Sequence, residues 1–300
     1  MGEVSPVAVV YVTRNRRDEL AGSLESLGRA TPGPSRILVV DNASADGTAE
    51  WLRREHPEVE VVAQDRNLGV ATGRTVGIEA VGEELVLCLD DDARLESADA
   101  FARVGERFDE SPQLAVLAFR IVNARRGETL GHEFPRRRLS ARGVERRQEV
   151  AYFIGCGFAA RRSTFLEAGG FNPLLHYGLE ELDLSYRLLE AGHRLLYDPA
   201  IVVRHRADPG SRRDRRWYFH MARSRIPVVL ANLPLWAAVP HLVLWHGGLL
   251  AHGLARGHAS AVVAGAAEGW RLAPRAWRKR RPISPGTAWR ILRLSGRLFF

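Results

Sequence analysis

Residues 85–93 read LVLCLDDDA, an apolar run that ends in three consecutive acids. The apolar part predicts a buried strand over residues 85–90. Open α/β sheets bind ligands at the carboxyl ends of their strands, so the acids would lie at such a binding edge. In extended geometry Asp90 and Asp92 point the same way and could hold one hard divalent ion, Mg²⁺ or Mn²⁺, while Asp91 faces elsewhere. The alternative is a solvated acidic turn.

Around this run, β-rich apolar segments alternate with helical patterns through the first 120 residues, as βαβ units require. Further strands are predicted over 7–12, 37–41, 59–63 and 114–121, and helices over 18–30, 46–55, 70–80 and 98–110. Ordered segments return at 152–160, a short helix at 163–168, a helix at 180–191, and two strand-like runs at 194–197 and 201–205. The pattern favours a doubly wound α/β sheet of the nucleotide-binding type.

The charge is unevenly divided along the chain. Its 300 residues are 46% hydrophobic and 26% charged, which is typical of a globular protein and excludes collagen-like, coiled-coil and disordered classes. The net charge of +8 separates into −7 over residues 1–203 and +15 over residues 204–300. Because the first part is acidic, we expect no nucleic-acid partner.

The cysteines and the N-terminus indicate the compartment. Cys88 and Cys156 lie in apolar surroundings, which favours buried free thiols in a reducing environment over a disulfide framework. The first residues carry an acid at position 3 before a very short apolar run, so they predict a first strand and not a secretory signal. We therefore expect a cytoplasmic protein.

Two segments stand outside the strand–helix alternation. Residues 123–150 are rich in Arg and lose periodicity, so they predict a long flexible loop, either solvated or a flap that binds phosphate or acceptor. Residues 226–255 contain no Asp, Glu, Lys or Arg, although three prolines interrupt them. This segment has three possible structures: an interfacial or re-entrant helix pair, a membrane span, or a buried or dimer-forming helical tail. The Arg clusters that flank it favour contact with anionic lipid headgroups.

A second acidic group, Glu180-Glu181-Leu182-Asp183, opens a predicted helix, whose N-terminal dipole favours negative charge. Glu180 and Asp183 share one face, and Glu181 points in a different direction. A carboxylate so placed is a candidate general base, with helix capping as the alternative. His205, at the end of a strand-like run, could complete a metal shell; a structural histidine is the alternative, which the acidic pair makes less favoured.

Several motifs in fixed order carry a resemblance to a known family. They are VVYVTRNR at 9–16, VVDNASADGT at 39–48, NLG at 67–69 with Gly73-Arg74, the acids at 90–92, GGF at 169–171, EELDL at 180–184 and His205. Over roughly residues 6–225 the chain resembles glycosyltransferase family 2, the inverting enzymes with a GT-A fold. The resemblance implies a mixed, mostly parallel sheet flanked by helices, with a nucleotide-binding half at 1–122 and an acceptor half at 151–225. Residues 226–300 would then form a basic and apolar helical tail that could associate with a membrane.

The resemblance also assigns roles to particular residues. Asp90 and Asp92 would hold the metal with His205 as a further ligand, and Glu181 would be the catalytic base, where Asp is usual in the family. The nucleotide sugar would contact Thr13, Asn15, Asp41, Arg74, Asp90 and Asp91. The acceptor would lie against Gly155, Cys156, Gly157, Glu180 and Asp183, the glycines permitting close approach.

The activity implied by the resemblance is transfer of a sugar from a dTDP-, UDP- or GDP-linked donor to a hydroxyl of a glycan, a lipid-linked or a small-molecule acceptor. The cofactor would be Mn²⁺ or Mg²⁺. The enzyme would act in the assembly of cell-envelope polysaccharide or glycolipid, at the anionic inner face of the cell membrane. The alternatives are a secondary-metabolite glycosyltransferase, a nucleotidyltransferase and a membrane-binding adaptor without turnover. A dehydrogenase is disfavoured because TRNR at 13–16, and not GxGxxG, follows the first strand.

Overall fold

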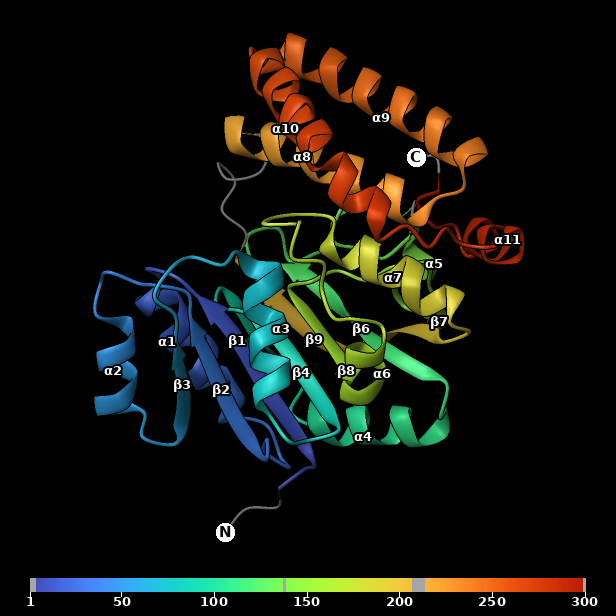
Figure 1. Cartoon of the computed structure of the whole chain (residues 1–300). Coiled ribbons are helices and arrows are strands. Elements are labelled where there is room, and N and C mark those ends of the chain that lie inside the picture. Colours follow the sequence, from blue (N-terminus) through green and yellow to red (C-terminus); the bar gives the residue numbers. More distant parts are fainter. Residues whose placement is uncertain (1–3, 137–138, 207–213, 299–300) are drawn as a thin grey trace.

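A mixed β-sheet runs through the middle of the molecule (Figure 1). The computed structural model describes residues 4–136, 139–206 and 214–298, and within these ranges the sheet has nine strands. The strands are β1 (Val7–Thr13), β2 (Arg36–Asp41), β3 (Val59–Ala63), β4 (Leu85–Asp90), β5 (Ala93–Leu95), β6 (Leu114–Asn123), β7 (Gln148–Glu149), β8 (Gly157–Arg161) and β9 (Arg194–His205). Their order is β3-β2-β1-β4-β8-β6-β9-β5, with β7 paired to β9. The pairs β1–β2, β1–β4, β2–β3 and β6–β9 are parallel. The other pairs are antiparallel.

The predicted elements of the first 120 residues are confirmed, with ends that shift by at most three residues. The helices that accompany the sheet are α1 (Arg17–Leu27), α2 (Thr48–Glu55), α3 (Val70–Ala80), α4 (Ala100–Glu110), α5 (Ala141–Val144), α6 (Arg162–Glu167) and α7 (Glu180–Glu190). The two runs predicted at 194–197 and 201–205 form the single strand β9. Its pairing with β6 slips where Phe119 faces Asp198 and Arg120 faces Val202, so the strand continues past Pro199 by a bulge.

The sheet is covered on both faces, which explains the continuous apolar runs of its strands. In β1, Val7, Val9 and Tyr11 join the apolar cluster formed with α1 and α4. The alternate residues Ala8 and Val10 join the cluster on the other face, with α3 and α7. This sandwich leaves the carboxyl ends of the parallel strands as the edge where polar groups can gather.

The Arg-rich segment at 123–150 is packed in the part that the structure describes. It carries α5 and β7, and Phe134 is fully buried with its ring edge-on to Tyr197. Arg120 pairs with Glu145 at 2.8 Å. Arg137 and Arg138 of this Arg-rich segment lie outside the described residues.

In the described residues 214–298 four further helices follow, in agreement with the helical tail that the sequence predicts: α8 (Arg215–Asn232), α9 (Leu235–Ala255), α10 (Ala259–Arg278) and α11 (Pro285–Arg293). The first three stack above α7 (Figure 1). The expected division after residue 225 falls inside α8. Asn232 of α8 donates from Nδ2 to Asp183 Oδ1 of α7 (2.8 Å), a buried bond between the two parts. None of the described helices has both the length and the hydrophobicity that a bilayer crossing requires.

Helix α10 packs tightly on α8 because two glycines of α10 face the α8 backbone. A Cβ at Gly265 would lie 2.2 Å from the Phe219 carbonyl oxygen, and a Cβ at Gly269 would lie 2.6 Å from that of Arg223. Neither distance is possible without a shift of one helix. The spacing of four residues therefore sets how closely the two helices approach.

We expect Gly265→Ala to destabilise the protein by about 1–3 kcal/mol, because the added methyl group overpacks the α8–α10 contact. Urea denaturation measures the free energy of unfolding. Gly248→Ala is the matched control: Gly248 lies in α9 with open space around it, so the change should be neutral or stabilising by up to about 1 kcal/mol. Equal effects of the two substitutions would contradict the packing described.

Candidate active site

A buried arginine lies at the centre of the acidic edge. Arg74 of α3 is 4% exposed, and its Nη2 donates to Asp90 Oδ1 at the end of β4 (2.5 Å) and to the Gly155 carbonyl (2.9 Å). Its Nη1 lies 3.6 Å from Oε1 of both Glu180 and Glu181 at the start of α7. One guanidinium therefore brings together three of the carboxylates that the sequence singles out.

Of the two glutamates, Glu180 is buried and Glu181 is partly exposed. Burial, together with the neighbouring charge of Glu181, raises the pKa of Glu180 to about 8. Burial also raises the pKa of Glu181, although Arg74 opposes it. Glu180 Oε2 and Arg74 Nη1 are buried and make no hydrogen bond, so both can serve a polar ligand.

A side chain at position 155 would clash with the site, which explains the glycine there. A Cβ at this position would lie 2.0 Å from Glu181 Oε1 and 2.7 Å from Arg74 Nη1. The predicted close approach at Gly155 is therefore an approach to Glu181 and Arg74.

The three consecutive acids have different sets of partners: Asp90 meets Arg74, whereas Asp91 and Asp92 share Arg16. Strand β4 ends at Asp90 and a turn follows, so the strand alternation that predicted one direction for Asp90 and Asp92 does not extend to Asp92. Asp91 accepts from Thr13 Oγ1 (2.9 Å), and burial raises its pKa to about 7. Asp92 lies 2.9 Å from Arg16 Nη2 and 3.4 Å from His205 Nε2. Burial opposes its ionisation, but His205 and Arg16 hold the pKa of Asp92 at about 2.

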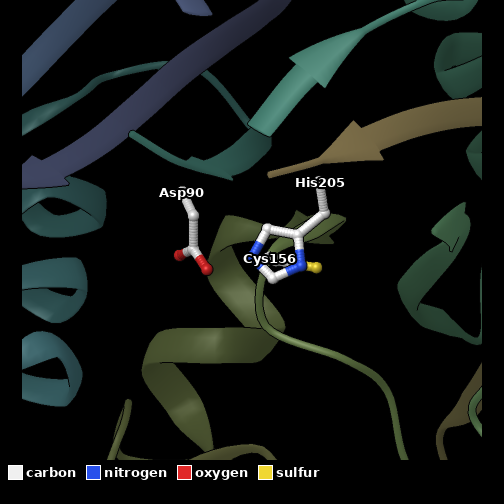
Figure 2. Close-up of side chains that lie close together, drawn as sticks. All are labelled: Asp90, Cys156 and His205. Atoms are coloured by element: carbon white, nitrogen blue, oxygen red, sulfur yellow. The ribbon is translucent and has the colours of Figure 1, made fainter. Parts of the chain in front are cut away.

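A group of possible metal ligands lies beside these acids. One ligand atom each of Asp90, Cys156 and His205 lies within 4.8 Å of the others, and Figure 2 shows the three side chains gathered in one place. The Asp90 side chain is 31% exposed, whereas Cys156 and His205 are buried. A carboxylate and an imidazole are suitable ligands for a divalent cation.

Glu133 is a site residue that the sequence reasoning did not find. It is fully buried in the Arg-rich segment, and its Oε1 lies 3.3 Å from His205 Nδ1. Burial alone would lower the pKa of His205, but the bonds to Asp92 and Glu133 raise it to about 10. Glu133 therefore occupies Nδ1 and leaves Nε2 directed at Asp92. No spacing rule links an acid to a histidine 72 residues later, so the sequence carries no signal for this pair.

The residues expected to hold a nucleotide lie where β1 and β2 end. Thr13 is the register partner of Asp41 across the two strands. Asp41 Oδ1 accepts from the Ser44 amide (3.0 Å), and Asn15 Oδ1 accepts from the Ala45 amide (2.7 Å). The loops after both strands are thus tied to each other beside Asp91.

Of the five residues expected at an acceptor site, Gly155, Cys156 and Glu180 lie at the acidic edge, and Gly157 and Asp183 make structural contacts instead. Gly155 and Glu180 lie with Glu181 and Arg74, as described, and the Cys156 thiol lies beside Asp90 and His205. Gly157 is a strand residue of β8, and a Cβ there would meet Val203 at 3.0 Å. Asp183 bonds to Asn232 and lies 2.6 Å from Arg187, so its carboxylate joins α7 to α8. The acceptor role of these residues stays a prediction.

Comparison with known proteins places the chain among glycosyltransferases. Residues 8–169 match the family described as Glycosyl transferase family 2. The pre-mycofactocin glycosyltransferase of Mycobacterium tuberculosis is 30% identical over 206 residues, which are 66% of this chain and 42% of that protein. The chain thus spans less than half the length of this relative. The N-acetylglucosaminyl-diphospho-decaprenol L-rhamnosyltransferase of M. tuberculosis is 29% identical over 246 residues, covering 71% of this chain and 80% of that protein.

Solved structures share the fold. GalNAc-T7, crystallised with UDP, GalNAc and Mn²⁺, has a TM-score of 0.64 and 18% identity over 82% of this chain and 51% of its own. The mannosyltransferase PcManGT from Pyrobaculum calidifontis, in complex with GDP-Man and Mn²⁺, has a TM-score of 0.59 and 18% identity over 97% of this chain and 89% of its own. The predicted GT-A fold is confirmed by these likenesses together with the mixed sheet.

The buried acids predict that metal-free protein loses stability as the pH rises. The pKa values of Asp91 (about 7) and Glu180 (about 8) lie above their ordinary values, so both carboxyls bind a proton more tightly in the folded chain. The stabilisation is complete below about pH 4 and is lost as the pH rises through about 7 to 8. Urea denaturation in EDTA between about pH 6.5 and 8.5 measures the decline, because the lowered pKa values of His220 and His241, both about 4, give stability the opposite slope below this range.

Glu180→Gln should remove part of this decline and recover at least about 1 kcal/mol at pH 8, because a neutral amide replaces the buried charge. Glu25→Gln, on the exposed surface of α1, is the control and should leave the slope unchanged. A wild-type stability that rises from about pH 6.5 to 8.5 would contradict the assignment.

Proposed function

The chain belongs to glycosyl transferase family 2, and on this premise we propose that it transfers a sugar from a nucleoside-diphosphate sugar to an acceptor hydroxyl with inversion. The observation that carries the proposal is the convergence on Arg74 of Asp90, which lies in the group of possible cation ligands, and the partly buried carboxylate of Glu181. The ends of β1 and β2, with Thr13 and Asp41, lie at the same edge of the sheet. A donor bound there would reach from the nucleotide loops to α7.

A divalent cation, Mn²⁺ or Mg²⁺, fits the chemistry of this edge. Asp90 and His205 would hold it, and Asp92, which lies 3.4 Å from His205 Nε2, is the third expected ligand. When bound, the cation neutralises charge on the departing nucleoside diphosphate. Thr13, Asn15, Asp41 and Asp91 would contact the nucleotide, and the base of the donor would be uracil, thymine or guanine.

Glu181 is the proposed general base. It would take the proton of the acceptor hydroxyl as that oxygen attacks the anomeric carbon from the face opposite the leaving group. Burial raises its pKa, which strengthens it as a base, and Arg74 keeps it ionised enough to act. Glu181 Oε1 itself occupies the place where a Cβ of residue 155 would lie, so Gly155 lets this carboxylate sit at the site where the acceptor would approach it.

We expect Glu181→Gln to bind the nucleotide-sugar donor almost as well as the wild type and to lose transfer by about 10²-fold or more, because the amide cannot accept the proton. Calorimetry measures donor binding, and release of nucleoside diphosphate measures transfer. Glu79→Gln, an exposed residue of α3, is the control and should remain active. An active Glu181→Gln enzyme would contradict the assignment.

The acceptor is proposed to be presented at an anionic membrane surface on the cytoplasmic side, in cell-envelope glycan or glycolipid assembly. The outer side of α9 supports this: it carries exposed apolar side chains and no charged residue from Leu235 to Ala255. The basic residues 278–281 follow at the end of α10. An uncharged helix beside cations is typical of a helix that lies in the lipid headgroup region. A relative is named for a decaprenol-linked substrate, which is consistent with a lipid-linked acceptor.

We expect Val243→Glu to weaken binding to vesicles of phosphatidylglycerol and phosphatidylcholine by about tenfold or more, because it removes apolar contact and adds a repelled charge. Vesicle co-sedimentation measures the binding. Val4→Glu is the matched control: Val4 is 64% exposed and Val243 is 66% exposed, and the N-terminus lies at the opposite end of the molecule from α9 (Figure 1). Equal vesicle binding by both variants would contradict the membrane proposal.

A further inference from the structure

The group of possible metal ligands contains a sulfur atom. Cys156 is 4% exposed, and its Sγ lies within 4.8 Å of a ligand atom of Asp90 and of His205 (Figure 2). Pairing of β8 with β4 sets this position, because Gly157 faces Leu89 and the Asp90 amide donates to the Cys156 carbonyl (3.2 Å). Cys156, the residue before β8, therefore lies next to Asp90, the last residue of β4.

The second cysteine of the chain is placed differently. Cys88 lies inside β4, opposite Phe158 of β8, and belongs to the apolar core on the α3 side of the sheet. It is not part of the group with Asp90 and His205. Both thiols are buried and free, so the two residues differ in their neighbours and hardly in their exposure.

A sulfur ligand changes which cations a site prefers. Mg²⁺ takes oxygen ligands almost exclusively, whereas a set of imidazole, thiolate and carboxylate suits ions such as Zn²⁺ and Co²⁺. Ligand atoms on one Zn²⁺ ion lie at most roughly 4 Å apart, since its bonds measure about 2.0–2.3 Å. Small side-chain rotations would bring three atoms now within 4.8 Å onto one ion.

The surroundings of Cys156 argue against a covalent role. Burial raises the pKa of this thiol well above its ordinary value, and the charges of Asp90, Glu133 and Asp92 add to the shift. A thiol in this environment is a poor nucleophile on its own. The same nearby carboxylates favour a bound cation.

We propose that Cys156 is a metal ligand, and that with Asp90 and His205 it makes this site select a thiophilic divalent ion over Mg²⁺. The inference rests on the cation site of the proposed function and specifies which ions occupy it. On binding, a metal–sulfur bond replaces the S–H bond of Cys156, and the proton is released to solvent. Glu133, on Nδ1 of His205, would keep Nε2 of the imidazole directed at the ion.

Cobalt titration of the reduced, EDTA-treated full chain tests the proposal, with Co²⁺ alone as the probe. A sulfur-to-cobalt charge-transfer band should appear in the near ultraviolet at one Co²⁺ per chain, and a large excess of Mg²⁺ should not remove it. Cys156→Ala should lose the band and bind Co²⁺ about tenfold or more weakly. Cys88→Ala, the matched control, should keep both the band and the affinity. A far-ultraviolet spectrum of each metal-free variant checks its fold.

A wild-type chain without the band overturns the proposal, and this result depends on no variant. Persistence of the band in Cys156→Ala, or its removal by Mg²⁺, also overturns it. Failure of the proposed function looks different. If the band behaves as expected but no nucleotide sugar is consumed, the metal inference stands and sugar transfer fails; if the band is absent but Mn²⁺-supported transfer occurs, only the metal inference fails.

Discussion

The structure depends on one buried charge, the guanidinium of Arg74. A buried cation left without partners would cost several kcal/mol, so its surroundings must supply negative and carbonyl groups. They come from three places in the chain: Asp90 at the end of β4, the Gly155 carbonyl before β8, and the two glutamates that begin α7. The carboxylates of Asp90, Glu180 and Glu181, when ionised, would repel one another without Arg74. Their convergence turns a strand end, a glycine loop and a helix start into one site.

Strand pairing and hydrogen bonds fix the positions of the segments around this charge. Parallel strands that end in register bring Asp41 opposite Thr13, and Asp90 opposite Val12. Helix α8 then holds the loop that leads into α7: Ser224 Oγ donates to the Tyr177 carbonyl and Arg223 Nη1 to the Leu174 carbonyl, both at 3.0 Å. The C-terminal helices are therefore part of the support of Glu181. Helix α8 lies between α7, which carries the proposed base, and α9, whose surface we propose to contact lipid.

Much of the fold follows from the sequence because strands with both faces buried leave no polar alternation, as VAVVYVT in β1 illustrates. Motifs in order were enough to single out Asp90 and Glu181, which the structure brings together. The missed features are those that depend on tertiary pairing. Glu133 meets His205 only because a segment without periodicity packs under the sheet edge. Asp183 shares a helix face with Glu180, but no spacing could reveal that Asn232 of α8 covers it. Strand β9 continues past Pro199 because its partners β6 and β5 hold both ends.

We propose that the edge formed by β1, β2 and β4 binds a nucleoside diphosphate through a divalent cation. This can be tested by calorimetric titration of UDP, dTDP and GDP, each in Mn²⁺ and in EDTA. We expect that at least one of the three binds in Mn²⁺, that this binding is lost in EDTA, and that folded Asp90→Ala binds it in neither condition. Equal binding with and without the cation, or undiminished binding by Asp90→Ala, would contradict it.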